Sequence, residues 1–337
     1  MRTAVHILLA CLCSTGLKAQ DGVPFFAGRA PLLLDPSRTG FDPGGQLALL
    51  HQDQWLQVPG AWRNEQLATG WNLRNTKKEV DSWLGLGAVA LQQQGGAANG
   101  RLNTLGVLAA MHLRAGRRSF LSAGLEMRWN RGMIGDGGTW ASQYDGLRHD
   151  PARASGEAWA SSQRSWADAR AGISFTLKRA EESPRRRERD LLVAGLSAGH
   201  LGHLVLQESG RYSPPAPVLL NLYVLGEMPI EPWPNGFLAA EMMGHLQGPF
   251  ATGRLNLYAG KHLYNRTRAA GEAALLGFKA GLGYRWRDAL LVNAALDLGN
   301  YTFGLAYGWA VLLPEGRAVG RRTVELLVQA HIGGKPG

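Results

Sequence analysis

Residues 166–178, WADARAGISFTLK, decide the fold of this chain. Alanine, isoleucine, phenylalanine and leucine occupy every second position from Ala167 to Leu177, and mostly polar residues stand between them. Because successive side chains of a β-strand point to opposite faces of the sheet, this stretch predicts a strand with one apolar and one polar face. A strand of a lipid-bounded barrel has this pattern, with apolar side chains outward and polar side chains in the lumen.

The same alternation recurs from Ser119 to Asn130, from Ala251 to Tyr258 and from Ala274 to Arg287. These segments run to about 9 to 14 residues, whereas strands of globular sheets have roughly 5 to 6. Tryptophans lie near the ends of several segments, where an amphipathic ring can rest among lipid headgroups. Length and aromatic ends therefore favour a membrane barrel over a soluble sandwich. The tryptophans in question are Trp83, Trp129, Trp166 and Trp286.

Counting the alternating segments predicts an all-β fold, a transmembrane antiparallel β-barrel of about 14 strands in the outer membrane. An even number of strands returns both ends of the barrel to one side, conventionally the periplasm. No apolar run reaches the length of about 18 residues that a transmembrane helix needs. The predicted strands are 46–57, 61–73, 82–94, 102–114, 118–131, 165–178, 188–200, 216–228, 234–247, 250–261, 273–287, 288–299, 300–313 and 321–332.

The first 19 residues have the features of a secretory signal peptide, namely a basic Arg2, an apolar run and a small-residue exit at Ala19. Removal of this peptide leaves an N-terminal periplasmic segment, residues 20–45, followed by the barrel, residues 46–337. The stretch ending at Cys11 also resembles a lipobox, so lipoprotein processing at that cysteine is an open alternative.

Composition and motifs argue against two classes of function. The formal net charge is +10, but the arginines are scattered along the strands and no basic helix is present, so we expect no nucleic-acid partner. We find no G-x-S-x-G elbow and no serine and histidine with a third partner, so we expect no enzyme and no cofactor. His200 and His203, three apart at a strand end, point to opposite faces, which disfavours a metal site.

The longest predicted connection runs from Arg131 to Arg164 and faces outward. Aromatic residues in a glycine-bearing loop are typical of protein contact surfaces. Carboxylates in the same loop leave a calcium-stabilised loop open as an alternative, at Asp136, Asp145, Asp150 and Glu157. The predicted partner-binding residues are Trp140, Tyr144, Asp145 and Trp159.

Several short stretches carry a family resemblance. Phe25-Phe26 precedes a leucine-rich run in which Asp35-Pro36-Ser37 stands where the family has asparagine, proline and alanine. Further matches are 54–55, 59–61, 140–146, 150–151, 156–157, 169–173 and 195–201. In order and spacing, these stretches resemble the PorP/SprF family, outer-membrane proteins of Bacteroidetes associated with type IX secretion and gliding motility.

The resemblance implies a non-catalytic role in attaching a secreted adhesin or other cargo to the surface, or in supporting its export. The implied partners are outer-membrane lipid, the secreted surface protein and components of the type IX system. The alternative is a passive or substrate-selective porin, which requires a water-filled lumen, whereas a plugged lumen favours attachment. An outer-membrane lipid enzyme would need a Ser/His pair at the outer rim. The lumen-lining residues expected for a porin are Arg170, Arg254, Asn256, Lys279 and Arg285.

Overall fold

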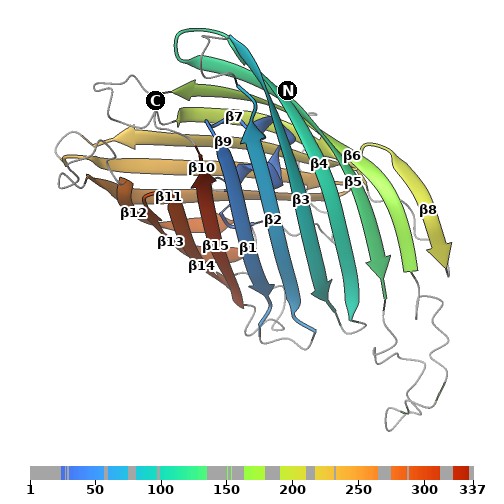
Figure 1. The fold of residues 1–337 in the computed structure, drawn as a ribbon. Helices are drawn as coiled ribbons and strands as arrows, with labels where there is room; N and C mark the ends of the chain where they lie inside the picture. The colour runs from blue at the N-terminus through green and yellow to red at the C-terminus, as the bar shows by residue number, and fades with distance from the viewer. Residues whose placement is uncertain are drawn as a thin grey trace, which may run out of the picture.

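The chain folds into a closed antiparallel β-barrel in the computed structural model (Figure 1). The structure describes residues 24–26, 28, 30–56, 60–74, 81–96, 99–134, 150, 153, 163–178, 190–209, 217–230, 233–264, 275–286, 288–311 and 322–333. The strands are β1 (Gly45–Gln54), β2 (Trp62–Asn72), β3 (Ser82–Gly95), β4 (Gly100–Arg114), β5 (Ser119–Met133), β6 (Gln163–Lys178), β7 (Asp190–Gly199), β8 (His203–Ser209), β9 (Leu219–Pro229), β10 (Gly236–Gln247), β11 (Phe250–Tyr264), β12 (Leu275–Arg285), β13 (Ala289–Leu298), β14 (Tyr301–Ala310) and β15 (Arg322–Ile332).

Fourteen of these strands form the ring, and β1 pairs with β15 to close it. Each strand of the ring pairs with its neighbours in sequence order, β7 being followed by β9. The predicted fold class is therefore confirmed.

The strand β8 has no counterpart among the predicted strands. Residues 171–178 of β6 pair with β7, and residues 163–168 of the same strand pair with β8. Between β7 and β8 the backbone turns at His200 and Gly202, both with positive φ. Thus β7 and β8 follow one another along β6, and among the described strands β8 pairs with β6 alone (Figure 1).

Alternation along the strands separates a polar inner face from an apolar outer face. In β13, Leu290, Val292 and Leu296 are exposed on the outside, while Leu291 and Asn293 are buried inside. A side-chain period of two gives each strand this division once the ring has closed. Among the described residues, no helix is long and apolar enough to cross a membrane.

The two rims of the barrel differ in their connections. We call the end at which β1, β3 and β5 finish the distal rim; the connection 134–162 begins there. The opposite end, where β1 begins and β15 ends, is the proximal rim.

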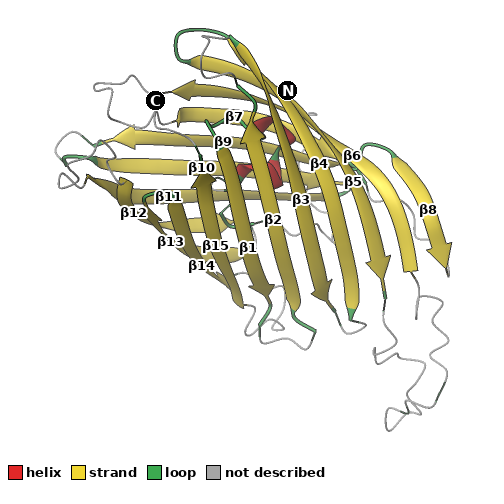
Figure 2. Cartoon of the chain, viewed as in Figure 1, coloured by secondary structure: helices red, strands yellow, loops and turns green. Residues whose placement is uncertain are grey.

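The N-terminal residues described before β1 lie inside the ring, and we call residues 24–26, 28 and 30–44 the lumen segment. It contains a short helix, α2 (Pro31–Leu34), and a 3-10 turn, η1 (Pro36–Arg38), both visible within the barrel (Figure 2). Phe25, Phe26 and Leu32 are fully buried in one cluster with inward side chains such as Leu327. Residues 25–33 of the predicted periplasmic segment 20–45 thus contribute Phe25, Phe26 and Leu32 to an apolar core inside the barrel.

Candidate functional site

Most of the predicted partner-binding loop lies outside the described residues. Its four residues Trp140, Tyr144, Asp145 and Trp159 lie outside the described residues, as do the calcium candidates Asp136 and Glu157. The candidate site lies in the barrel lumen, which is lined by the inward side chains of the ring strands.

A buried carboxylate on β15 holds the start of the lumen segment. The backbone N–H groups of Phe25 and Phe26 donate to Glu325 Oε2 and Oε1, each at 2.7 Å. The side chain of Gln52 donates to Oε2 at 2.6 Å. Glu325 has no solvent-exposed surface. Because it accepts three buried hydrogen bonds, this carboxyl group anchors the segment where the ring closes.

Another buried carboxylate, Glu241 on β10, organises the wall beside Phe25. Lys279 Nζ donates to it at 3.2 Å, and Tyr258 Oη donates at 3.2 Å. Asn256 Nδ2 lies 3.4 Å both from Glu241 Oε2 and from the backbone oxygen of Phe25. The lysine also lies 4.0 Å from the centre of the Tyr258 ring. These inward polar groups bind one another and the lumen segment.

Two of the residues expected to line a porin also hydrogen-bond to the lumen segment. Arg254 donates to the backbone oxygen of Pro24. Arg170 Nη1 donates to the backbone oxygen of Leu33 at 2.9 Å. Arg254, Lys279 and Asn256 are at most 6% exposed. At these positions the lumen is filled by protein.

Asp35 holds the turn η1 against strands β6 and β9 of the barrel wall. Its Oδ1 accepts the backbone N–H of Ser37 at 2.8 Å, and its Oδ2 accepts the Tyr223 hydroxyl at 2.7 Å. Burial is the largest influence on this carboxyl and raises the pKa of Asp35 above its ordinary value of 3.8. A Cβ at Gly172 of β6 would lie 1.9 Å from Asp35 Oδ1, so only glycine allows the segment to approach this closely.

An aromatic cluster covers the end of the lumen segment. Trp83 Nε1 donates to the backbone oxygen of Gly40 at 3.1 Å, and its ring stacks on His112 at 5.0 Å. The His112 Nε2 lies 2.8 Å from the backbone oxygen of Thr39, and its Nδ1 lies 2.8 Å from Ser122 Oγ. If Nε2 donates, Nδ1 accepts the serine proton. This Ser–His contact is buried and its third partner is a backbone carbonyl.

His200 and His203, the two candidate metal ligands, contact different groups. His200 Nδ1 lies 2.9 Å from Asp168 Oδ2, and the ring of His203 is close to Arg164 and to Trp166. Among the described residues, no group of three or more potential ligands could hold a metal ion.

Sequence reasoning missed the lumen segment as a structural element. One signal was present, because Phe25, Phe26 and the run Leu32 to Leu34 are strongly apolar for a segment that was expected to lie in water. The buried Glu325 and Glu241 carry no local signal, since inward polar residues are ordinary in a barrel strand.

A family model described as "Type IX secretion system membrane protein PorP/SprF" matches residues 24–328. This match confirms the resemblance seen in the sequence. No curated protein matches the chain.

Among solved structures, a FadL homologue of Pseudomonas aeruginosa is 10% identical, with 89% of this chain and 93% of that chain covered and a TM-score of 0.47. The toluene transporter TodX of P. putida is 10% identical, with coverage of 88% and 90% and a TM-score of 0.41. CdiB from Acinetobacter baumannii is 9% identical, with 86% of this chain covered and a TM-score of 0.40. The present chain covers only 60% of the CdiB chain.

Proposed function

The chain belongs to the PorP/SprF family of type IX secretion system membrane proteins and is an outer-membrane β-barrel, and from this premise we propose that it attaches a secreted surface protein by protein–protein contacts. In this proposal the barrel is a support and not a conduit. Its partner is an adhesin or other cargo of the type IX system, held at the loops of the distal rim.

The filled lumen is the observation that supports this proposal. A porin needs a continuous polar path through the barrel, lined by charged side chains in contact with water. Here Arg170 and Arg254 donate to backbone oxygens of the lumen segment, and Lys279 donates to Glu241. A barrel whose inward charged side chains are hydrogen-bonded to protein groups inside it is suited to present its outer loops from a rigid base.

The proposal includes the absence of catalysis. The described Ser–His contact, between Ser122 and His112, lies under Phe41 and Trp83 and is closed to substrate. His200 Nδ1 lies 2.9 Å from Asp168 Oδ2.

The test is recovery of the cargo together with the barrel. A tagged chain is cross-linked in intact cells and purified from solubilised outer membranes, and co-purifying proteins are identified by mass spectrometry. The triple variant W140A/Y144A/W159A alters the predicted contact loop. The matched control is Tyr301→Ala, an exposed aromatic at the other rim.

We expect a large secreted surface protein with wild type and with the control, and at least tenfold less of it with the triple variant at equal barrel abundance. Equal recovery from all three barrels would contradict a contact at this loop. A barrel that co-purifies no secreted protein and conducts ions in planar bilayers would replace the proposal by the porin alternative.

A further inference from the structure

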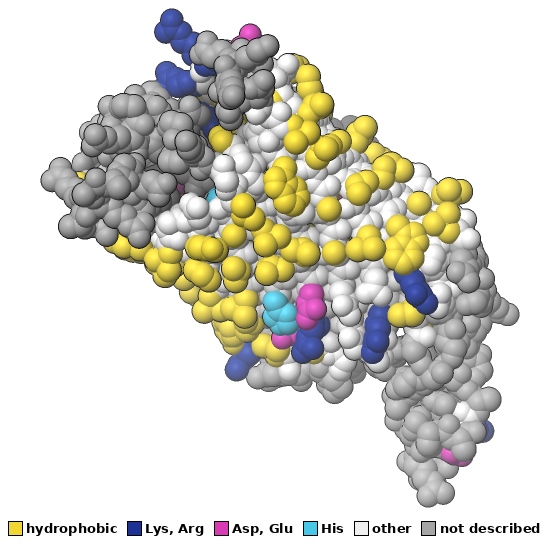
Figure 3. Space-filling view, in the orientation of Figure 1, with side chains coloured by type: hydrophobic (Ala, Val, Ile, Leu, Met, Phe, Trp, Pro, Cys, Tyr) yellow, Lys and Arg dark blue, Asp and Glu magenta, His cyan; other side chains and the backbone are white. Residues whose placement is uncertain are grey.

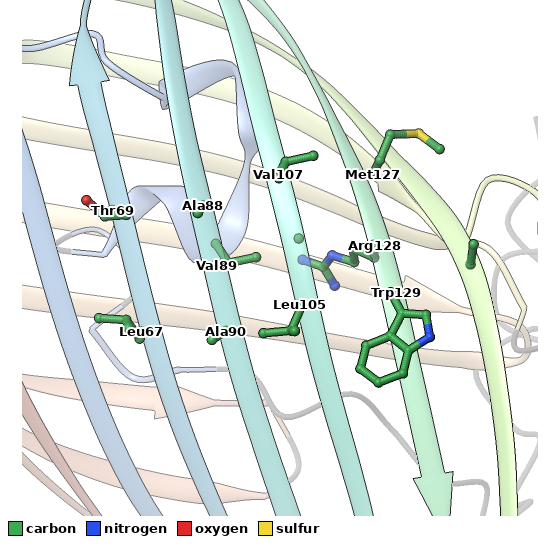
Figure 4. A pocket seen from close by; sticks show the side chains of 12 residues that line it. Leu67, Thr69, Ala88, Val89, Ala90, Leu105, Val107, Met127, Arg128 and Trp129 are labelled. Carbon is green, nitrogen blue, oxygen red and sulfur yellow. The ribbon is translucent and has the colours of Figure 1, made fainter.

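A furrow runs along the outer wall of β2 to β5, and its shape follows from the strand register. Ala90 of β3 lies directly between Leu67 of β2 and Leu105 of β4, and Ala88 lies between Thr69 and Val107. Two small outward side chains on β3 therefore form a floor with larger side chains on both sides, as Figure 4 shows. The hollow over this floor has a volume of about 540 Å³.

The furrow continues toward the distal rim into a hollow of about 720 Å³. The two hollows share four lining residues, so they form one continuous surface depression. Volumes of this size lie in the usual range of ligand pockets, about 300 to 1,000 Å³. The shared residues are Leu67, Ala90, Leu105 and Trp129.

The wall changes from apolar to polar between one row of outward side chains and the next. The register places Leu49, Leu67, Ala90, Leu105 and Trp129 side by side across five strands. Space-filling in Figure 3 shows apolar side chains across this wall and charged side chains gathered nearer the distal rim. A tryptophan at such a boundary is typical of the lipid–water interface. The next row consists of His51, Glu65, Gln92, Asn103 and Arg131.

The charges of the polar end select the kind of headgroup. Among the residues that line the hollow, Glu65 is the acidic one; its side chain is 52% exposed, and His51 Nδ1 lies 3.7 Å from its Oε1. No arginine or lysine lines this half. The nearby Arg63 lies 3.2 Å from Asp53, and Arg131 donates to Gln163 at 3.0 Å. A carboxylate with neighbouring amides accepts and donates hydrogen bonds to hydroxyl groups, but it repels a phosphate.

We propose that the furrow binds a neutral glycolipid of the membrane leaflet at the distal rim. One acyl chain lies over Ala88 and Ala90 between the leucines, and the sugar hydroxyl groups hydrogen-bond to Glu65, Gln92 and Asn103. The furrow is continuous with the lipid-facing wall, so an acyl chain reaches it without leaving the membrane. The proposal depends on the barrel lying in a membrane and not on the attachment of a secreted protein.

Native mass spectrometry of the purified full chain in detergent tests the proposal. The probe is dimyristoyl glucosyl-glycerol, offered beside phosphatidylglycerol with the same acyl chains. Ala90→Phe fills the floor of the furrow. Ala280→Phe is the matched control, because Ala280 is also an outward alanine, on β12 at another part of the wall.

We expect the glucosyl lipid to bind wild type and the A280F barrel equally, and to bind the A90F barrel at least tenfold more weakly. Gln92→Leu, which leaves the floor open, should weaken binding of the glucosyl lipid without weakening binding of phosphatidylglycerol. This second variant tests the proposal if the A90F barrel fails to insert. Equal binding to A90F and A280F would overturn the proposal. Tighter binding of phosphatidylglycerol than of the glucosyl lipid by wild type would overturn the assigned headgroup.

Discussion

Replacement of Glu325 by alanine should release the start of the lumen segment from the barrel wall. Glu325 accepts three hydrogen bonds, from the backbone of Phe25, the backbone of Phe26 and the side chain of Gln52. Each buried donor left unpaired costs about 1–3 kcal/mol, and water that enters the vacated space recovers part of this. We therefore expect docking of the segment to weaken by roughly 3–6 kcal/mol.

The assay is hydrogen exchange of the Phe25 and Phe26 amides, measured by mass spectrometry on the barrel in detergent. At about 1.4 kcal/mol per factor of ten, the two amides should exchange roughly 10² to 10⁴ times faster in E325A than in wild type. The control is Gln329→Ala, which truncates another buried inward side chain of β15. Unchanged exchange in E325A, or the same acceleration in Q329A, would refute the role given to this carboxylate.

Three further predictions concern the same segment. Burial raises the pKa of Asp35, so above pH 3.8 the native state binds more protons than the unfolded state and loses stability as the pH rises. Asp35→Asn should flatten this pH dependence of the melting temperature, measured by thermal unfolding between pH 4 and 8. An unchanged slope would disprove the role of Asp35 in it. Tyr223→Phe removes the hydrogen bond to Asp35 and should destabilise the barrel by about 1–3 kcal/mol at pH 7, which denaturant unfolding measures; a loss below 0.5 kcal/mol, by the same rough scale, would speak against it. Gly172→Ala places a Cβ on Asp35, so it should lower the free energy of unfolding by about 1–3 kcal/mol and raise single-channel conductance in planar bilayers. Gly244→Ala, with open space at its Cβ, should do neither. Identical behaviour of both variants would count against a close approach at residue 172.

The sequence alone determined the strands of the ring, because a period of two is a local property of one strand between lipid and lumen. The predicted strand 61–73 corresponds to β2 (Trp62–Asn72), and the predicted strand 288–299 corresponds to β13 (Ala289–Leu298). It also carried the family resemblance, since that resides in short stretches of adjacent residues. The short strand β8 escaped this reasoning, because it depends on the N-terminal half of β6 as its pairing partner.

Only the tertiary structure decided what fills the barrel. Phe25 and Glu325 are 300 residues apart in the sequence, and they meet because β15 closes onto β1 around the lumen segment. In the sequence pattern, an inward glutamate cannot be distinguished from any other polar residue that faces water in a pore. The furrow has the same origin, since Ala88 and Ala90 become a floor only when the register sets Leu67 and Leu105 beside them. Alternation fixes which face a side chain occupies, and the closed ring decides what that side chain touches.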